Sequence, residues 1–176
     1  MLAQDETDVL LFPPLRAAWA KRGQQARVHL TGRNARRVIF GALDLRTGRR
    51  VLLCRERQRA SDFIVFLEQL RHAYRKRPLV LLLDENPSHT ARASQRRAAE
   101  LNIRLLWLPK RCPELNPMDH LWRAPKQVVC ANRQAPTIDV AVGRAVRYLE
   151  GLTPRAALRK AGVLSPSFWL RRALSK

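Results

Sequence analysis

The stretch L-V-L-L-L-D, from Leu79 to Asp84, decides the fold of this chain. It is a continuous apolar run without polar alternation, which is typical of a strand that is buried on both faces of a sheet. The run ends at Asp84, so this carboxylate is expected at the carboxyl end of a central parallel strand. Open α/β sheets bind their ligands at that edge. We therefore predict an α/β protein with a functional site at Asp84.

The segments on either side of this strand predict a mixed sheet with crossover helices. Before this strand, apolar spacing and turn residues indicate two short extended pieces at 2–4 and 9–12 around an acidic turn, then a hairpin of strands at 37–45 and 50–54. A helix at 61–74, capped by Ser61, follows the hairpin. After the strand, we expect a helix at 91–101, a buried strand at 103–108 and a helix capped by Asn116. After Arg133 the sequence becomes rich in Ala, Val and Arg. We expect one domain at residues 1–133 and a helical C-terminal appendage at 134–176.

The charge of the chain indicates a polyanionic partner. Its 34 Lys and Arg residues against 14 Asp and Glu give a formal net charge of +20 in 176 residues. Such an excess repels itself unless a polyanion offsets it, and nucleic acid is the natural candidate. The other interpretation is a basic protein whose charges are only solvated or face a ribosome. The residues expected to contact DNA phosphates are Arg33, Arg36, Arg37, Lys110, Arg111 and Lys126.

Cysteine usage and hydropathy exclude two other classes of protein. The three cysteines form no C-x-x-C pair, which argues against a zinc site and fits a reducing cytosol. No apolar run approaches the roughly 20 residues that a membrane-spanning helix requires. We therefore expect a cytoplasmic protein without a membrane partner.

Three aspartates stand at positions where catalytic carboxylates are expected. Asp84 closes a buried strand, Asp5 lies near the first extended piece, and Asp119 is the third residue of the helix that Asn116 opens. Each has an ordinary alternative: Asp84 could cap the next helix unless Ser88 does so, Asp5 could belong to an acidic turn, and Asp119 could favour the helix dipole. The combination favours metal binding, because clustered carboxylates repel one another unless divalent cations lie between them. Hard oxygen ligands select Mg²⁺ or Mn²⁺.

Several of these stretches together resemble a known family. They are D-E-T at 5–7, W-A-K-R-G at 19–23, V-I-F-G-A-L at 38–43, L-L-L-D-E-N-P-S-H at 81–89 and L-P-K-R-C-P-E-L-N-P-M-D-H-L-W at 108–122. In this order they closely resemble the DDE endonuclease domain of bacterial insertion-sequence transposases of the mariner superfamily. The resemblance covers roughly residues 2–133. The 34 residues between Asp84 and Asp119 are similar to the spacing in that superfamily.

The resemblance implies a fold, a reaction and a set of residues. The fold would be ribonuclease-H-like, with three antiparallel strands followed by two parallel strands. Asp5, Asp84 and Asp119 would hold two Mg²⁺ or Mn²⁺ ions, which activate a water or a 3′-hydroxyl and stabilise the leaving 3′ oxygen during DNA cleavage and strand transfer. Accessory roles are implied for His89, Asn116 and Glu6. The partners would be transposon-end and target DNA and a second copy of the chain, in association with the bacterial nucleoid.

The chain departs from the family pattern in several respects. The third acid is Asp119, where insertion-sequence relatives more often have Glu, and Pro125 predicts that the helix bearing Asp119 kinks or ends there. No helix-turn-helix region precedes Leu2, so recognition of terminal repeats would be absent or come from another chain. A short first strand could fray and misplace Asp5. An inactive remnant that only binds DNA is therefore the alternative, whereas another nuclease of this fold is disfavoured by the P-E-L-N-P block.

Overall fold

A five-stranded sheet forms the centre of the computed structural model, which describes residues 1–75 and 77–174. The strands are β1 (Leu2–Leu10), β2 (Arg36–Asp44), β3 (Arg50–Arg55), β4 (Leu79–Leu83) and β5 (Ile103–Trp107), in the order β3-β2-β1-β4-β5. β1, β2 and β3 are antiparallel neighbours, whereas β4 runs parallel to both β1 and β5. The predicted mixed sheet is confirmed.

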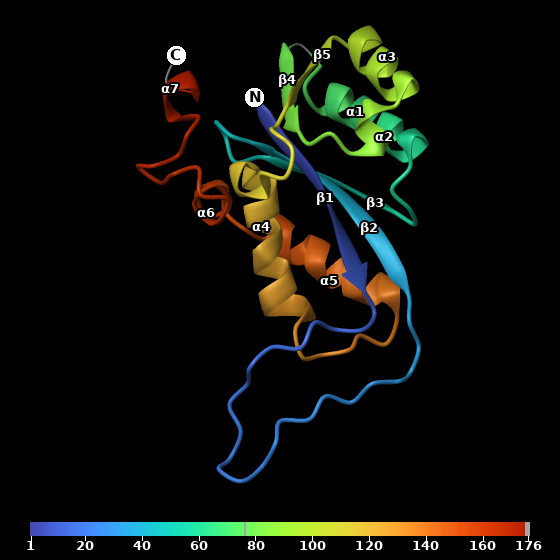
Figure 1. The fold of residues 1–176 in the computed structure, drawn as a ribbon, viewed down its shortest axis with the longest axis vertical. Helices are drawn as coiled ribbons and strands as arrows, with labels where there is room; N and C mark the ends of the chain where they lie inside the picture. The colour runs from blue at the N-terminus through green and yellow to red at the C-terminus, as the bar shows by residue number, and fades with distance from the viewer. Residues whose placement is uncertain (76, 175–176) are drawn as a thin grey trace.

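Helices cover both faces of this sheet (Figure 1). One face carries α1 (Ala60–Ala73), α2 (Pro87–Thr90) and α3 (Arg92–Glu100), and the other carries α4 (Pro117–Pro125), α5 (Ile138–Glu150) and α6 (Pro154–Lys160). Short elements complete the described chain: a 3₁₀ turn η1 (Pro113–Leu115), a π-helical turn η2 (Lys126–Cys130) and α7 (Arg171–Leu174). None of the described helices is long and apolar enough to cross a membrane.

The two cores follow from side-chain alternation along the strands. Successive strand residues point to opposite faces, so Leu2 packs on the side of Phe63 and its neighbour Ala3 on the side of Trp122. Phe63 and Trp122 are both fully buried. Because each face of the sheet is covered by helices, nearly all of β4 is buried, as the apolar run predicted.

β1 is one continuous strand, and the expectation of two short pieces around an acidic turn is wrong. It pairs with β2 from Leu2↔Asp44 to Leu10↔Arg36, and with β4 at its start. These backbone hydrogen bonds hold the acidic residues in an extended conformation. The ion pair between Asp8 and Arg36 (2.9 Å) further offsets the local negative charge. The strand that carries Asp5 is thus paired along its whole length.

The start of α1 also differs from the prediction. The helix begins at Ala60, and its N-cap residue, Arg59, provides no side-chain hydrogen bond, so the expected cap at Ser61 is wrong. The apolar stripe that predicted the helix is correct, because Phe63 and Phe66 are among its buried residues. Burial of this stripe, rather than a capping side chain, stabilises the helix.

The segment after residue 133 completes the second core. α5 buries Ile138, Val142 and Leu149 in the same cluster as residues of β1 and α4. The helical nature of this segment is as predicted, and the division of the chain at residues 133 and 134 stays a prediction. Pro125 ends α4, which passes into η2, as expected from the missing N–H and the steric bulk of proline.

A long arm, residues 11–35, connects β1 to β2 and extends away from the body of the molecule (Figure 1). Its base is held by the segment after η2. Asn132 accepts from the backbone N–H of Arg16 (2.8 Å), and Gln134 accepts from that of Thr31 (2.6 Å). Trp19 on the arm is fully exposed.

Candidate active site

Asp84 lies at the carboxyl edge of the sheet, directly after β4, and its side chain is about half exposed. Its Oδ1 accepts from Nδ1 of His89 (2.9 Å) and from the backbone N–H of Asn86 (3.2 Å). The bond from His89, above all, holds the pKa of the Asp84 carboxyl below its usual range. α2 is capped by Asn86, whose Oδ1 accepts from the N–H of Ser88 (3.0 Å). The helix predicted at 91–101 is α3, whose N-cap residue Ala91 forms no side-chain hydrogen bond, so neither Asp84 nor Ser88 caps it.

Asp5 reaches the same edge from the neighbouring strand. Ala3 in β1 pairs with Leu82 in β4, so Asp5 and Asp84 each lie two residues farther along adjacent parallel strands. The pKa of the Asp5 carboxyl is raised well above its usual value, first by burial and then by repulsion from Glu6, Asp119 and Asp84. The electrostatic effect of Asp119 and Asp84 on Asp5 shows that the three predicted aspartates lie near one another.

Asp119 is brought to this edge by the first turn of α4. Asn116 caps that helix as predicted, because its Oδ1 accepts from the N–H of Met118 (3.0 Å). The other end of the same amide, Nδ2, donates to the carbonyl of Gln4 (2.9 Å), one residue before Asp5. Asn116 is buried and therefore fixes the start of α4 against β1.

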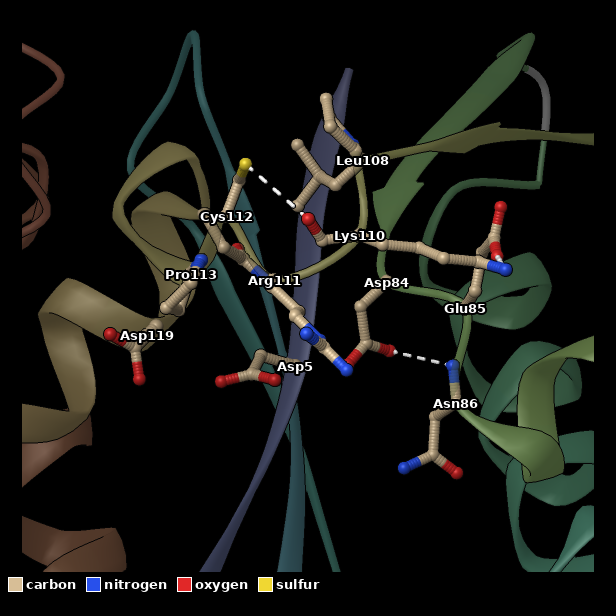
Figure 2. Close-up of a pocket in the computed structure, with 12 residues that line it drawn as sticks. Asp5, Asp84, Glu85, Asn86, Leu108, Lys110, Arg111, Cys112, Pro113 and Asp119 are labelled. Carbon is tan, nitrogen blue, oxygen red and sulfur yellow. Dashed lines mark hydrogen bonds and ion pairs between the residues drawn. The ribbon is translucent and has the colours of Figure 1, made fainter.

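The three aspartates line one open cavity of about 420 Å³. Figure 2 shows Asp5 at its floor, with Asp84 and Asp119 on opposite sides. The cavity is also lined by Glu85, Asn86, Leu108, Pro109, Lys110, Arg111, Cys112, Pro113 and Asn116. Folding thus gathers residues from β1, the end of β4 and α4, which are far apart in the sequence.

The carboxylates fit divalent cations chemically, although they do not form a closed cage. Within residues 1–75 and 77–174, no three His, Cys, Asp or Glu side chains are gathered closely enough to form a ready-made metal site. Mg²⁺ commonly keeps several waters and uses only one or two carboxylates together with substrate phosphates. Burial first, and then repulsion from Glu6, Asp119 and Asp84, raises the pKa of the Asp5 carboxyl, and a bound cation would favour its charged form. All three donors are hard oxygens, which suit Mg²⁺ or Mn²⁺.

Glu6 and His89, expected to be accessory, lie behind the cavity rather than in its lining. His89 is fully buried, and its Nε2 is 2.8 Å from Oε1 of Glu6. Burial alone would lower the pKa of His89, but its bonds to Asp84 and Glu6 raise this pKa to about 10. Sequence reasoning missed Gln58, whose Nε2 donates to Oε2 of Glu6 (3.1 Å), because a contact across 52 residues leaves no local pattern.

The predicted DNA-contacting residues fall into two groups. Lys110 and Arg111 lie at the cavity, where Lys110 forms an ion pair with Glu85 (3.2 Å) and Arg111 has a positive φ of 59°. The others lie elsewhere. Arg36 pairs with Asp8, Arg37 lies 3.7 Å from both Glu56 and Asp139, and Arg33 and Lys126 are exposed to solvent.

The sheet has the strand order β3-β2-β1-β4-β5, with Asp5 on the central strand β1 and Asp84 directly after the neighbouring strand β4. This arrangement is that of the ribonuclease-H-like class of folds. The chain belongs to the DDE superfamily endonuclease family, whose sequence model matches residues 1–140. The family that the motifs suggested is therefore confirmed.

Individual relatives agree with this family. The "Insertion element IS630 uncharacterized 39 kDa protein" of Shigella sonnei is 28% identical over 153 residues, which cover 86% of this chain and 45% of that protein. The fold is similar to that of a Mos1 transposase paired-end complex with left transposon end (TM-score 0.73, 18% identity, 99% of this chain and 54% of that chain). It is also similar to the catalytic domain of Mos1 mariner transposase (TM-score 0.68, 18% identity, 99% and 80% coverage). The chain spans about half the length of the insertion-element protein and of the Mos1 chain in the paired-end complex.

Proposed function

We propose that this chain is the catalytic domain of a DNA transposase that cleaves DNA phosphodiester bonds and transfers the strand. Asp5, Asp84 and Asp119 would together bind two Mg²⁺ or Mn²⁺ ions. The observation that carries this proposal is the cavity that all three aspartates line, in which burial and then the nearby carboxylates, Asp119 and Asp84 among them, raise the pKa of Asp5. Membership of the DDE superfamily endonuclease family supports it.

The proposed division of work in the cavity follows from its geometry. Two bound divalent ions would supply activation of a water or 3′-hydroxyl and stabilisation of the leaving 3′ oxygen. Asp5 offers its carboxylate from the floor, Asp84 from the end of β4 and Asp119 from the start of α4. Lys110 and Arg111, which also line the cavity, would bind phosphates beside the scissile bond and so align the DNA strand.

The partners of the chain are proposals of the same kind. Transposon-end and target DNA fit the formal charge of +20, and Mos1, whose fold is similar, was crystallised with Mg in a paired-end complex. We further propose that two copies act together and that the protein associates with the nucleoid.

The alternative, an inactive remnant that only binds DNA, has no observation in its favour. An inactive chain would be expected if the first strand frayed and displaced Asp5. Instead, β1 is paired with β2 along its length, and Asn116 donates a hydrogen bond to the carbonyl of Gln4, which precedes Asp5. Both contacts support the proposal that Asp5 is held in place at the cavity.

Nicking of supercoiled plasmid DNA tests the proposal directly. The wild-type chain is expected to nick in Mg²⁺ or Mn²⁺ but not in EDTA, and Asp84→Asn should abolish nicking while DNA binding persists. Asp139→Asn, which removes an exposed carboxylate outside the cavity, serves as the matched control and should nick normally. Equal nicking by Asp84→Asn and the wild type would refute the proposal, as would no metal-dependent nicking by the wild type.

A further inference from the structure

We propose that Glu6 and His89 are positioning residues that leave a single oxygen of Asp84 open to a cation and thereby favour Mg²⁺ or Mn²⁺ over Ca²⁺. This inference rests on the proposed function of the cavity. Neither residue lines the cavity, so neither is proposed to touch the metal or the DNA.

The first step concerns Asp84 itself. Its Oδ1 already accepts two hydrogen bonds, from Nδ1 of His89 (2.9 Å) and from the N–H of Asn86 (3.2 Å). The same Nδ1 lies 3.1 Å from the Asp84 carbonyl oxygen, so the imidazole contacts both the backbone and the side chain of Asp84. Oδ2 is the carboxylate oxygen that these bonds leave available.

The second step concerns the imidazole. His89 has no exposed side-chain surface, and its ring packs against Phe63 of α1 with 4.4 Å between the ring centroids. Its Nε2 is committed to Glu6 (2.8 Å). With both nitrogens bonded and one face covered, the ring cannot turn without breaking two buried hydrogen bonds, so it holds the Asp84 carboxylate in one orientation.

The third step concerns Glu6, whose side chain is only 6% exposed. Its Oε1 accepts from Nε2 of Gln4 (2.7 Å) as well as from His89, and its Oε2 accepts from Gln58 (3.1 Å). Three donors occupy this carboxylate, which therefore anchors the imidazole. Asp5 and Glu6 are adjacent in β1 and point to opposite faces of the sheet. Asp5 therefore lines the cavity, whereas Glu6 lies outside its lining and bonds to His89.

The consequence is a preference among cations. Because Oδ1 of Asp84 is hydrogen-bonded to His89 and Asn86, the carboxylate can bind a metal through Oδ2 only. Mg²⁺ requires near-octahedral geometry with short bonds and suits such single-oxygen ligands, whereas Ca²⁺ accepts carboxylates through both oxygens in a flexible shell. Release of Asp84 from His89 would allow two-oxygen binding and so reduce the discrimination against Ca²⁺.

Cation titration of the purified chain tests this inference. The dissociation constants for Mn²⁺ and Ca²⁺ are measured by calorimetry for the wild type, Glu6→Ala and Glu6→Gln. We expect Glu6→Ala to weaken Mn²⁺ binding about 10- to 100-fold, the usual effect of removing a group that orients a ligand. Ca²⁺ binding should change much less, so the preference for Mn²⁺ falls about tenfold or more. Glu6→Gln keeps an acceptor for His89 and should retain the wild-type preference.

Two controls keep the outcomes distinct. Glu68→Ala removes one negative charge outside the cavity and should leave both affinities unchanged. Thermal unfolding in EDTA shows whether Glu6→Ala folds. If it does not, Gln58→Ala is the second variant, because Gln58 is partly exposed and donates one of the hydrogen bonds that hold the Glu6 carboxylate. Gln58→Ala should lower the Mn²⁺-to-Ca²⁺ preference in the same direction but by less. An unchanged Mn²⁺-to-Ca²⁺ preference in a folded Glu6→Ala chain would overturn the inference alone, whereas no Mn²⁺ binding by the wild type would overturn the proposed function.

Discussion

Asn116 joins the helix that carries Asp119 to the strand that carries Asp5. Its side-chain oxygen caps α4 at the N–H of Met118, and its nitrogen donates to the carbonyl of Gln4 across 112 residues. A single buried amide therefore sets the distance between two of the three carboxylates. The asparagine of the P-E-L-N-P block thus has a structural role that its capping function alone does not reveal.

Replacement of Asn116 should destabilise the fold. Asn116→Ala removes a helix cap, which costs about 1 kcal/mol, and takes a buried donor from the Gln4 carbonyl, which costs about 1–3 kcal/mol. We expect the free energy of unfolding in urea to fall by about 2–4 kcal/mol as the sum of these effects. Asn34→Ala, in the exposed arm, is the control and should change little. Equal stability of the two variants would contradict this role.

Gly41 is required by the packing of α4 on the sheet. A Cβ at this position would lie 2.6 Å from the ring of Trp122 and 2.5 Å from Cε of Met118, both buried side chains of α4. Gly41→Ala should therefore cost about 1–3 kcal/mol of unfolding free energy through overpacking, and should weaken activity by displacing Asp119.

Gly143 provides the matched comparison, because a Cβ there meets only the end of the Arg147 side chain at 3.5 Å. In the interior of α5, Gly143→Ala should stabilise the chain by roughly 0.5–1 kcal/mol. Thermal or urea unfolding of both variants measures the difference. A neutral Gly41→Ala would show that α4 does not approach β2 as closely as described.

The free energy of unfolding of the chain should depend on pH through Asp5. Because the folded state raises the pKa of this carboxyl, the folded chain binds more protons than the unfolded chain between the usual aspartate pKa and the raised value. The contribution of Asp5 is thus favourable at low pH and is lost as the pH rises through that window. Asp5→Asn removes both the cost of burying the charge and the repulsion from neighbouring carboxylates. This variant should be more stable than the wild type at pH 7 in EDTA, by about 1.4 kcal/mol for each unit of the pKa shift.

Divalent cations should reverse this order. Mg²⁺ stabilises whichever folded state binds it, so the melting temperature of the wild type should rise with Mg²⁺ concentration while that of Asp5→Asn changes much less. Differential scanning calorimetry at several pH values, with EDTA or Mg²⁺, provides both readouts. A wild type that is more stable than Asp5→Asn in EDTA at pH 7 would show that burial and the neighbouring carboxylates do not raise the pKa of Asp5 as described.

DNA binding should depend steeply on salt and on Arg111. If the chain makes about 6–10 phosphate contacts, its affinity should fall by roughly 10³ to 10⁵ between 50 and 200 mM salt. Arg111→Ala leaves the backbone strain of the positive φ unchanged and should lower the slope of log K against log salt by about 0.9. Arg104→Ala, an exposed arginine outside the cavity, is the control in fluorescence anisotropy titrations. Identical slopes for both variants would exclude Arg111 from the DNA contact.

Local patterns predicted much of the fold because they reflect burial and capping close in sequence. The apolar run before Asp84 became a buried strand, and Asn116 with Pro117 began a helix. Predictions failed where neighbouring structure overrides local preference. The acidic residues of β1 looked like a turn, but pairing with β2 and β4 holds them in a strand. Likewise, the helix predicted at 91–101 begins as α3 without a capping side chain, so Ser88 does not cap it.

By itself, the sequence determined the type of most elements through apolar periodicity, and it singled out Asp5, Asp84 and Asp119 as acids in a basic chain. Only the tertiary structure decided that these three share a cavity, and that Glu6 and His89 support Asp84 from behind it. The physical reason is that secondary structure depends on neighbours a few residues apart, whereas strand order and helix docking bring together groups more than 80 residues apart and depend on the burial of the whole core.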